Sequence, residues 1–202
     1  MFHAKPARLP FSMLYCALFV GVVLGAVGLP ANSRSGQPAP AEDLDGKPAD
    51  PFALSGRRVI VLLFVRTDCP ISNRYAPLLQ KLSEKFRGKA DFWLVYPDRE
   101  QTASQIRAHL KDFHYSIPAL RDTRHALVKR AQATITPEAA VFDPAGRPVY
   151  HGRIDNWYAD FGRSRPAPTT HELDDAISAA LGGKTVTPDH ANPIGCYISD
   201  LK

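Results

Sequence analysis

The stretch that most constrains the fold is residues 59–86, where an apolar run leads through a cysteine into an amphipathic segment. Residues 59–65 read Val-Ile-Val-Leu-Leu-Phe-Val, without interruption and rich in β-branched side chains, which is typical of a strand buried on both faces of a sheet. The next apolar residues have the spacing of one helix face: Tyr75, Leu78, Leu79, Leu82 and Phe86. This strand and helix predict an α/β fold.

Cys69 lies between that strand and that helix, beyond the carboxyl end of the strand, where open α/β sheets expose functional groups. A thiol at a helix start faces unpaired N–H groups and the positive end of the helix dipole, which favour the thiolate. Arg66 and Arg74 would favour it further, and Asp68 would oppose it. Although many free cysteines are small buried hydrophobes, this position favours a reactive thiol.

The turn at residues 67–72, Thr-Asp-Cys-Pro-Ile-Ser, resembles the active-site turn of thioredoxin-fold proteins. More narrowly, it resembles the redoxin branch, which includes peroxiredoxins and periplasmic thiol–disulfide oxidoreductases. Pro77 matches the helix-kinking proline of thioredoxins, and residues 136–147 resemble the family's cis-proline strand and following hairpin. The resemblance implies a thioredoxin-like fold, with a central mixed sheet flanked by helices and, in this chain, an N-terminal apolar segment.

The resemblance also implies the roles of several residues. Cys69 would be the attacking thiolate, and Thr67, Thr136 and Pro137 would contact the substrate, with a cis bond before the proline. Ser72 occupies the second cysteine position of a C-x-x-C turn, so the usual dithiol relay within the turn is absent.

Cys196 is the candidate resolving thiol, as resolving cysteines occur in redoxin tails. The tail before it contains two prolines, which exclude a helix, and Gly195 allows the backbone to approach closely. The alternative is a disordered tail whose cysteine pairs between molecules.

Residues 11–29 carry no charge and follow Lys5 and Arg8, an arrangement typical of a cleaved export signal. They are also numerous enough to span a bilayer as an uncleaved anchor. Either alternative predicts an exported protein, periplasmic or otherwise extracytoplasmic, because the positive charges favour an N-terminus inside. The exported part would then face an oxidising compartment, where disulfides persist.

We expect four parts: a signal peptide or anchor at 1–32, a linker at 33–41, a redoxin domain at 42–182, and a tail at 183–202 carrying Cys196. Within the domain the patterns predict the following: a hairpin turn at 43–47, a strand at 92–96, a helix bearing Ile106, Leu110 and Phe113, a connector at 117–120, a short helix at 125–131, a hairpin of 139–142 with 147–152, and a last helix before Gly182. The insert at 155–168 would form either a wall of a substrate groove or a surface loop held by its aromatic residues.

The net charge of +5 is dispersed along the chain, which argues against a nucleic-acid partner. The scattered histidines are interpreted as surface or packing residues, and we predict no cofactor and no metal. One alternative remains, a copper site formed by His190, Cys196 and Cys69, since thiolate and imidazole suit Cu(I).

The sequence therefore predicts a thiol-dependent oxidoreductase that exchanges disulfides with a disulfide or dithiol partner protein. A peroxidase that reduces hydroperoxides is the first alternative, although Arg66 stands where peroxiredoxins place a threonine or serine. A non-catalytic copper carrier or binding module is the second. The membrane would be a partner only through an uncleaved N-terminal segment.

Overall fold

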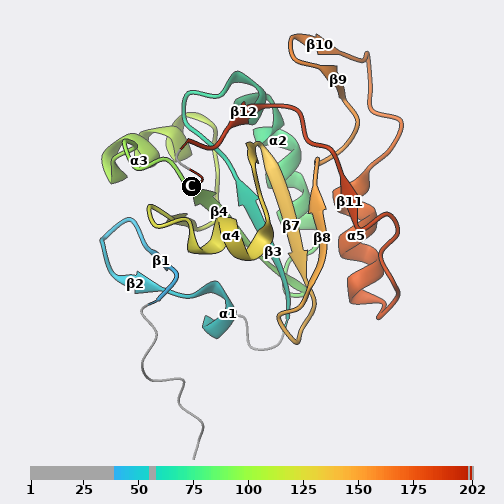
Figure 1. Ribbon diagram of the computed structural model, residues 1–202, viewed down its shortest axis with the longest axis horizontal. Helices are drawn as coiled ribbons and strands as arrows, with labels where there is room; N and C mark the ends of the chain where they lie inside the picture. The colour runs from blue at the N-terminus through green and yellow to red at the C-terminus, as the bar shows by residue number, and fades with distance from the viewer. Residues whose placement is uncertain (1–38, 55–57, 200, 202) are drawn as a thin grey trace, which may run out of the picture. The chain divides into compact units, whose positions relative to one another are not determined.

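The apolar run predicted as a buried strand forms β3 (Val59–Phe64), at the middle of a mixed sheet (Figure 1). The computed structural model describes residues 39–54, 58–199 and 201, and within these ranges the sheet has eight strands in the order β11-β8-β7-β3-β4-β5-β1-β2. The strands are β1 (Ala41–Glu42), β2 (Pro48–Ala49), β3, β4 (Ala90–Tyr96), β5 (Ala119–Arg121), β6 (Ile135–Thr136), β7 (Glu138–Phe142), β8 (Pro148–Gly152), β9 (Tyr158–Asp160), β10 (Arg163–Ser164), β11 (His190–Ala191) and β12 (Cys196–Tyr197).

The five central strands form a mixed sheet because parallel pairs on one side of β3 meet antiparallel pairs on the other. β3 pairs in parallel with β4, and β4 with β5, whereas β3 pairs antiparallel with β7, and β7 with β8. Parallel neighbours need a crossover, and the helix that follows β3 supplies the first one. The predicted α/β architecture with a central mixed sheet is therefore confirmed.

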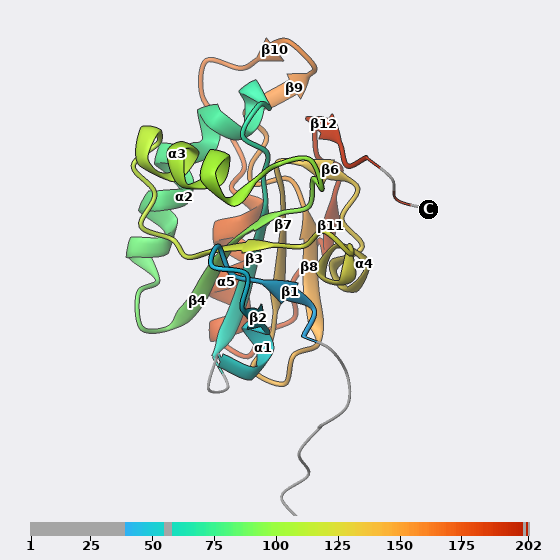
Figure 2. The same cartoon turned by 90° about the vertical axis from the view of Figure 1, so that its left-hand side faces the viewer.

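Alternate residues of β3 enter two separate cores, which explains why the run is apolar throughout. Val59, Val61 and Leu63 pack in the core that contains α2 and α5, and Ile60, Leu62 and Phe64 pack in the core that contains α4. The helices are α1 (Pro51–Leu54), α2 (Pro70–Lys85), α3 (Ala103–Asp112), α4 (Ala126–Ala131) and α5 (Glu172–Leu181). Figure 2 shows α2 and α5 on one side of the sheet and α4 on the other.

Two short segments differ from the sequence expectation. Residues 117–120 were expected to form a connector, but Ala119–Arg121 is the strand β5, with Leu120 buried beside β4. The insert at 155–168 contains the hairpin of β9 and β10. Segments of two or three residues are too short to show a periodicity, so neither strand could be recognised from its pattern.

The predicted signal or anchor at residues 11–29 lies outside the described residues. Within residues 39–54 and 58–199, no helix combines the length and apolar character needed to cross a bilayer.

The tail after α5 returns to the sheet at β8 and then crosses to β6 (Figure 1). β11 joins the edge strand β8 in parallel, with His190 opposite His151, and β12 pairs antiparallel with β6. The chain thus fixes its last cysteine at the loop before β7.

Candidate active site

Cys69 occupies the N-cap of α2, at the end of the loop that leaves β3. Pro70 takes the first helical position, where a missing N–H costs nothing because no partner exists within the helix. The Cys69 side chain is 1% exposed. The helix start therefore positions the sulfur against backbone donors and shields it from water.

Cys196 lies on β12, directly opposite Thr136 of β6. Its Sγ is 3.0 Å from the Sγ of Cys69, and both cysteines are free. The Sγ of Cys69 is also 3.3 Å from the carbonyl oxygen of Thr136. Two thiols that are 127 residues apart in the sequence are thus in direct contact in the reduced protein.

The tail approaches this closely because residue 195 is a glycine. A Cβ at Gly195 would lie 2.1 Å from the carbonyl oxygen of Thr136, a distance no side chain tolerates. On the far side of Cys196, the N–H of Ile198 donates to the carbonyl oxygen of Thr134 (3.0 Å), and the Ile198 side chain is buried. The tail is therefore an ordered strand with an apolar anchor after the cysteine.

The loop that receives the tail has the expected cis bond between Thr136 and Pro137. Both residues are buried, with Thr136 fully enclosed. The carboxylate of Glu138 accepts the N–H groups of Thr134 and Ile135, so a buried charge is satisfied while it shapes the loop. The two residues predicted to contact substrate there are covered by the chain's own tail.

Thr67, the third residue predicted to contact substrate, is half-buried in the turn before Cys69. Its N–H donates to Gln101 (3.4 Å), and its carbonyl oxygen accepts from the side-chain amide of Asn73 (3.0 Å). Asn73 contacts the ring of His109 (2.8 Å), which in turn contacts the hydroxyl of Tyr96 (2.8 Å). Burial lowers the pKa of His109, so its ring is neutral at neutral pH. The neutral ring connects Asn73, and through it the turn before Cys69, with Tyr96 in the core.

Sequence reasoning missed Asn73, Gln101 and His109 as supports of the active-site turn. His109 had been interpreted as a packing or surface residue, and it does pack in the core. Its spacing from Ile106 and from Phe113 placed it on the helix, but no local signal connects it with a turn more than thirty residues earlier.

The pKa of Cys69 is lowered from its ordinary value by its neighbours. Burial acts in the opposite direction and raises it, but the Cys196 thiol and the N–H groups of Ser72 and Ile71 stabilise the thiolate. The Ser72 hydroxyl also lowers the pKa. That hydroxyl is buried and forms no hydrogen bond within the described residues, so it can turn to donate to the thiolate.

The same contact raises the pKa of Cys196 to about 11, because burial, donation to Cys69 and the charge of the neighbouring thiolate all keep its proton in place. Neither Arg66 nor Arg74, which the sequence predicted to favour the thiolate, is among the main causes of the lowered Cys69 pKa. Arg66 forms ion pairs with Asp68 (3.0 Å) and Asp98 (2.8 Å), and Arg74 lies over the ring of Trp157. Of the two thiols, Cys69 therefore loses its proton first and Cys196 keeps its own.

Substitutions at Cys196 test whether its hydrogen bond lowers the pKa of Cys69. Cys196→Ala removes the donor to the Cys69 sulfur, so the pKa of Cys69 should rise, whereas Cys196→Ser keeps a hydroxyl donor and should leave it low. Titration of the thiolate ultraviolet absorbance measures both variants without a reagent that must reach the buried sulfur. Equal titration midpoints for the alanine and serine variants would contradict the assigned cause.

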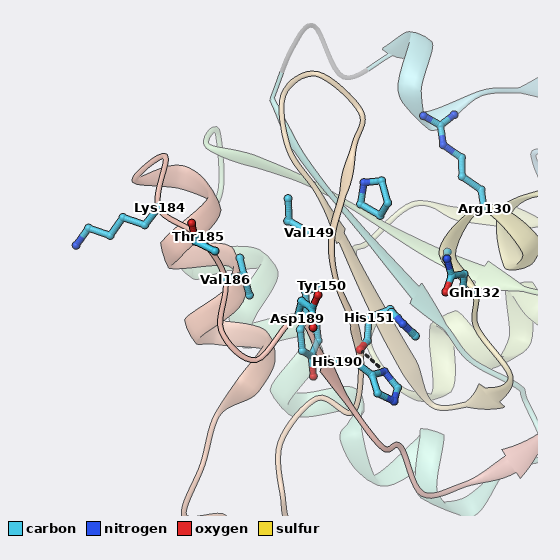
Figure 3. Close-up of a pocket in the computed structure, with 12 residues that line it drawn as sticks. Arg130, Gln132, Val149, Tyr150, His151, Lys184, Thr185, Val186, Asp189 and His190 are labelled. Atoms are coloured by element: carbon cyan, nitrogen blue, oxygen red, sulfur yellow. Dashed lines mark hydrogen bonds between the residues drawn. The ribbon is translucent and has the colours of Figure 1, made fainter.

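His190 does not join the two cysteines. Its Nδ1 contacts the carbonyl oxygen of His151 (3.1 Å), and its Nε2 contacts Asn192 (3.0 Å). Its ring lies against that of His151 at a tilt of 36° (Figure 3). Within the described ranges, no three His, Cys, Asp or Glu side chains gather as a metal site would require. The geometry gives no support to the copper alternative.

A cavity of about 460 Å³ lies between the end of α4, β8 and the start of the tail (Figure 3). Neither cysteine lines it. A second cavity, of about 400 Å³, borders the segments that carry the two cysteines. It is lined by Thr67 and Asp68 of the turn before Cys69 and by Ser199 of the tail.

Two aromatic residues of the insert at 155–168 hold it to the fold, whereas Phe161 is exposed. The rings of Trp157 and Tyr158 pack against Tyr75 of α2, whose hydroxyl donates to the buried Asp155 (2.5 Å). Tyr75, Asp155 and Tyr158 also line a small cavity with Pro137 and Ile194. The root of the insert thus borders both the cis-proline loop and the tail.

Comparison with known proteins agrees with this architecture. A family model described as Thioredoxin-like matches residues 56–148, which include Cys69, Thr136 and Pro137. No curated protein matches the chain significantly.

Solved structures share the fold. A hypothetical protein from Sinorhizobium meliloti 1021 is 24% identical, with a TM-score of 0.65 over 81% of this chain and 92% of its own. A thiol:disulfide interchange protein of the thioredoxin family from Chlorobium tepidum TLS is 17% identical, with a TM-score of 0.52 over 72% of this chain and 97% of its own. The pneumococcal exposed lipoprotein thioredoxin from Streptococcus pneumoniae strain TIGR4 is 18% identical, with a TM-score of 0.52 over 71% and 96%.

The chain is therefore a thioredoxin-fold protein, and the predicted resemblance to thioredoxin-fold redoxins is confirmed. The findings also agree with the predicted class of enzyme, a thiol-dependent oxidoreductase. At these identities the solved structures show a common fold.

Proposed function

We propose that the protein is an exported thiol–disulfide oxidoreductase in which Cys69 attacks and Cys196 resolves. The observation that carries the proposal is the 3.0 Å contact between the two sulfur atoms, with Cys69 at a helix N-terminus and its pKa lowered. Because Ser72 replaces the second cysteine of the turn, a thiol from the tail is the one that can complete a dithiol here.

The exchange proceeds in two displacements. The Cys69 thiolate attacks one sulfur of a partner disulfide, breaks its S–S bond, forms a mixed disulfide and releases the partner's other sulfur as a thiolate. Cys196 then loses its proton to that released thiolate or to water and attacks the Cys69 sulfur. This step forms the Cys69–Cys196 disulfide and releases the second partner thiolate. Two electrons pass from the dithiol to the partner, and a dithiol reductant would restore the starting state.

The raised pKa of Cys196 suits this order of events. A thiol with a pKa of about 11 stays protonated at neutral pH, so it supports the Cys69 thiolate before the attack. Once Cys69 is bonded to the partner, the negative charge beside Cys196 is gone, which favours its deprotonation and the second displacement.

Purified protein supplied separately with a disulfide substrate, a hydroperoxide and Cu(I) tests the proposal. We expect stoichiometric release of partner thiols with the disulfide, and a rate with hydroperoxide no higher than that of a free thiol at the same pH. Rapid peroxide consumption through sulfenic acid at Cys69 would replace the proposal with a peroxidase. Tight Cu(I) binding without exchange would replace it with a metal carrier.

Export is proposed from the charge pattern before residues 11–29. A reporter enzyme fused after Leu54 should be active only outside the cytoplasm, and removal of residues 1–32 should keep the fusion inside. Activity of the full fusion in the cytoplasm would contradict export.

A further inference from the structure

We infer that His109 is a positioning residue for Cys69, which holds the active-site turn through Asn73 while its ring is neutral and releases the turn when the ring gains a second proton. Together with Gln101, which lies just before α3, these two side chains form a clamp on the turn. The consequence of the clamp for turnover rests on the proposed thiol exchange, whereas its hydrogen bonds concern the turn alone.

The clamp holds both main-chain polar groups of Thr67, two residues before Cys69. The N–H of Thr67 donates to the side-chain oxygen of Gln101 (3.4 Å), whose amide donates in turn to Asp68 (3.2 Å). The carbonyl oxygen of Thr67 accepts from the side-chain amide of Asn73 (3.0 Å). Because the held residues lead directly into Cys69 at the N-cap of α2, fixing their main-chain groups fixes the position of the sulfur.

The contacts of Asn73 determine where the protons of the His109 ring lie. A main-chain carbonyl oxygen can only accept, so the amide nitrogen of Asn73 faces Thr67 and its amide oxygen faces Nε2 of His109 (2.8 Å). Nε2 therefore carries a proton. Nδ1 of the neutral ring is then free to accept the hydroxyl of Tyr96 (2.8 Å), so one neutral tautomer satisfies every group in the chain of contacts.

A second proton on the ring is incompatible with this pattern. Nδ1 would become a donor, and the hydroxyl proton of Tyr96 would have to turn away from it. Tyr96 is fully buried, and its hydroxyl has no other hydrogen-bond partner within the described residues, so the reversed hydroxyl would be left unsatisfied. The charged ring would also be buried, which is costly. A protonated His109 should therefore leave this position and lose its contact with Asn73.

The groups around the ring set the pH at which this happens. Burial raises the pKa of Tyr96 on β4 and of Tyr115 after α3, the two tyrosines whose rings face His109, so both keep their protons. From α2 the ring meets the uncharged amide of Asn73. Burial lowers the pKa of His109, and the charge of Asp112 on α3 opposes this without reversing it. The turn should therefore be released below pH 6.5, the ordinary pKa of histidine.

Release of the turn matters because the thiolate of Cys69 depends on donors at fixed positions. Burial raises the pKa of Cys69, and the Cys196 thiol and the N–H groups of Ser72 and Ile71 bring it below its ordinary value. A sulfur that moves away from these donors loses their stabilisation. In acid, the rate of the first displacement should therefore fall more steeply than protonation of a fixed Cys69 would produce.

Nuclear magnetic resonance of the reduced protein tests the clamp without any exchange reaction. The signals followed from neutral to acid pH are the ring Cε1–H of His109 and the amide groups of Thr67 and Asp68. In the wild type, the two amides should shift with the midpoint of the ring, below pH 6.5. His109→Gln keeps a donor and an acceptor but does not titrate, so this amide transition should disappear. His171→Gln removes an exposed histidine at the N-cap of α5 and should leave the transition unchanged.

Asn73→Ala removes the link and leaves the ring in place. The His109 ring should still titrate, and the amides of Thr67 and Asp68 should no longer follow it. At neutral pH, Asn73→Ala and His109→Leu should each slow the first displacement by about tenfold, because a small misplacement of a reacting group is costly. His109→Gln restores both hydrogen bonds of the ring and should recover most of this loss. Stopped-flow measurement of partner thiol release compares the rates.

The inference is overturned by amides that do not follow the His109 ring, by the same amide transition in His109→Gln, or by a ring that stays neutral until the protein unfolds. Equal rates for the leucine and glutamine variants would overturn it as well, since His109 would then only fill space. Where His109→Leu does not fold, Asn73→Ala decides the result. Amides that follow the ring in a protein without disulfide exchange would overturn the proposed function and leave the clamp standing.

Discussion

Cys69→Ser should abolish disulfide exchange, whereas Cys196→Ser should stop it after the first displacement. A serine hydroxyl at position 69 is not ionised at neutral pH, so the nucleophile is lost and the rate should fall about a thousandfold or more. With serine at 196, Cys69 keeps a hydrogen-bond donor and still attacks, but nothing displaces the partner. A mixed disulfide between Cys69 and the partner should therefore accumulate.

Mass spectrometry of the protein after reaction with a disulfide partner measures this difference. We expect the partner's mass on Cys196→Ser and none on Cys69→Ser. Ser72→Ala is the comparison, because it removes no thiol: turnover should continue, but more slowly, since the hydroxyl that lowers the pKa of Cys69 is lost. Full turnover by Cys196→Ser, without a trapped adduct, would show that the resolving thiol comes from another molecule.

Oxidation should raise the free energy of unfolding by up to about 4–5 kcal/mol in the chain-entropy model, because the new bond closes a loop of more than a hundred residues in the unfolded chain. The reduced protein already brings the two sulfur atoms to 3.0 Å, so little rearrangement is needed to form the bond. Denaturant unfolding of oxidised and reduced protein at neutral pH measures the difference.

Cys196→Ser treated with the same oxidant is the control and should show no gain in stability. An oxidised wild-type protein no more stable than the reduced one would mean that the disulfide either does not form within the chain or strains the tail by an equal amount.

Much of the fold is predictable from the sequence because its central elements have strong local patterns. The run at 59–65 is apolar on both faces, and the helix after Cys69 has one apolar stripe. Both β3 and α2 can therefore be predicted from the local sequence alone. β5 and the β9–β10 hairpin were missed because strands of two or three residues take their structure from the neighbour with which they pair.

The site is predictable only in part. Cys69 and the cis bond before Pro137 have sequence signals, and Gly195 indicates that the tail backbone can approach closely. The edge on which the tail docks has no such signal, because the pairing of β12 with β6 depends on the whole path of the chain around the sheet. The same holds for His109, whose contact with the active-site turn runs through Asn73.

The pairing of Cys69 with Cys196 is tested most directly by peptide mapping of dilute, mildly oxidised protein under non-reducing conditions. The geometry predicts one linked pair of peptides, containing Cys69 and Cys196, from the monomer band, and its loss on reduction. Linked peptides found only in dimers, or both thiols free after oxidation, would contradict the role of Cys196 as the resolving thiol.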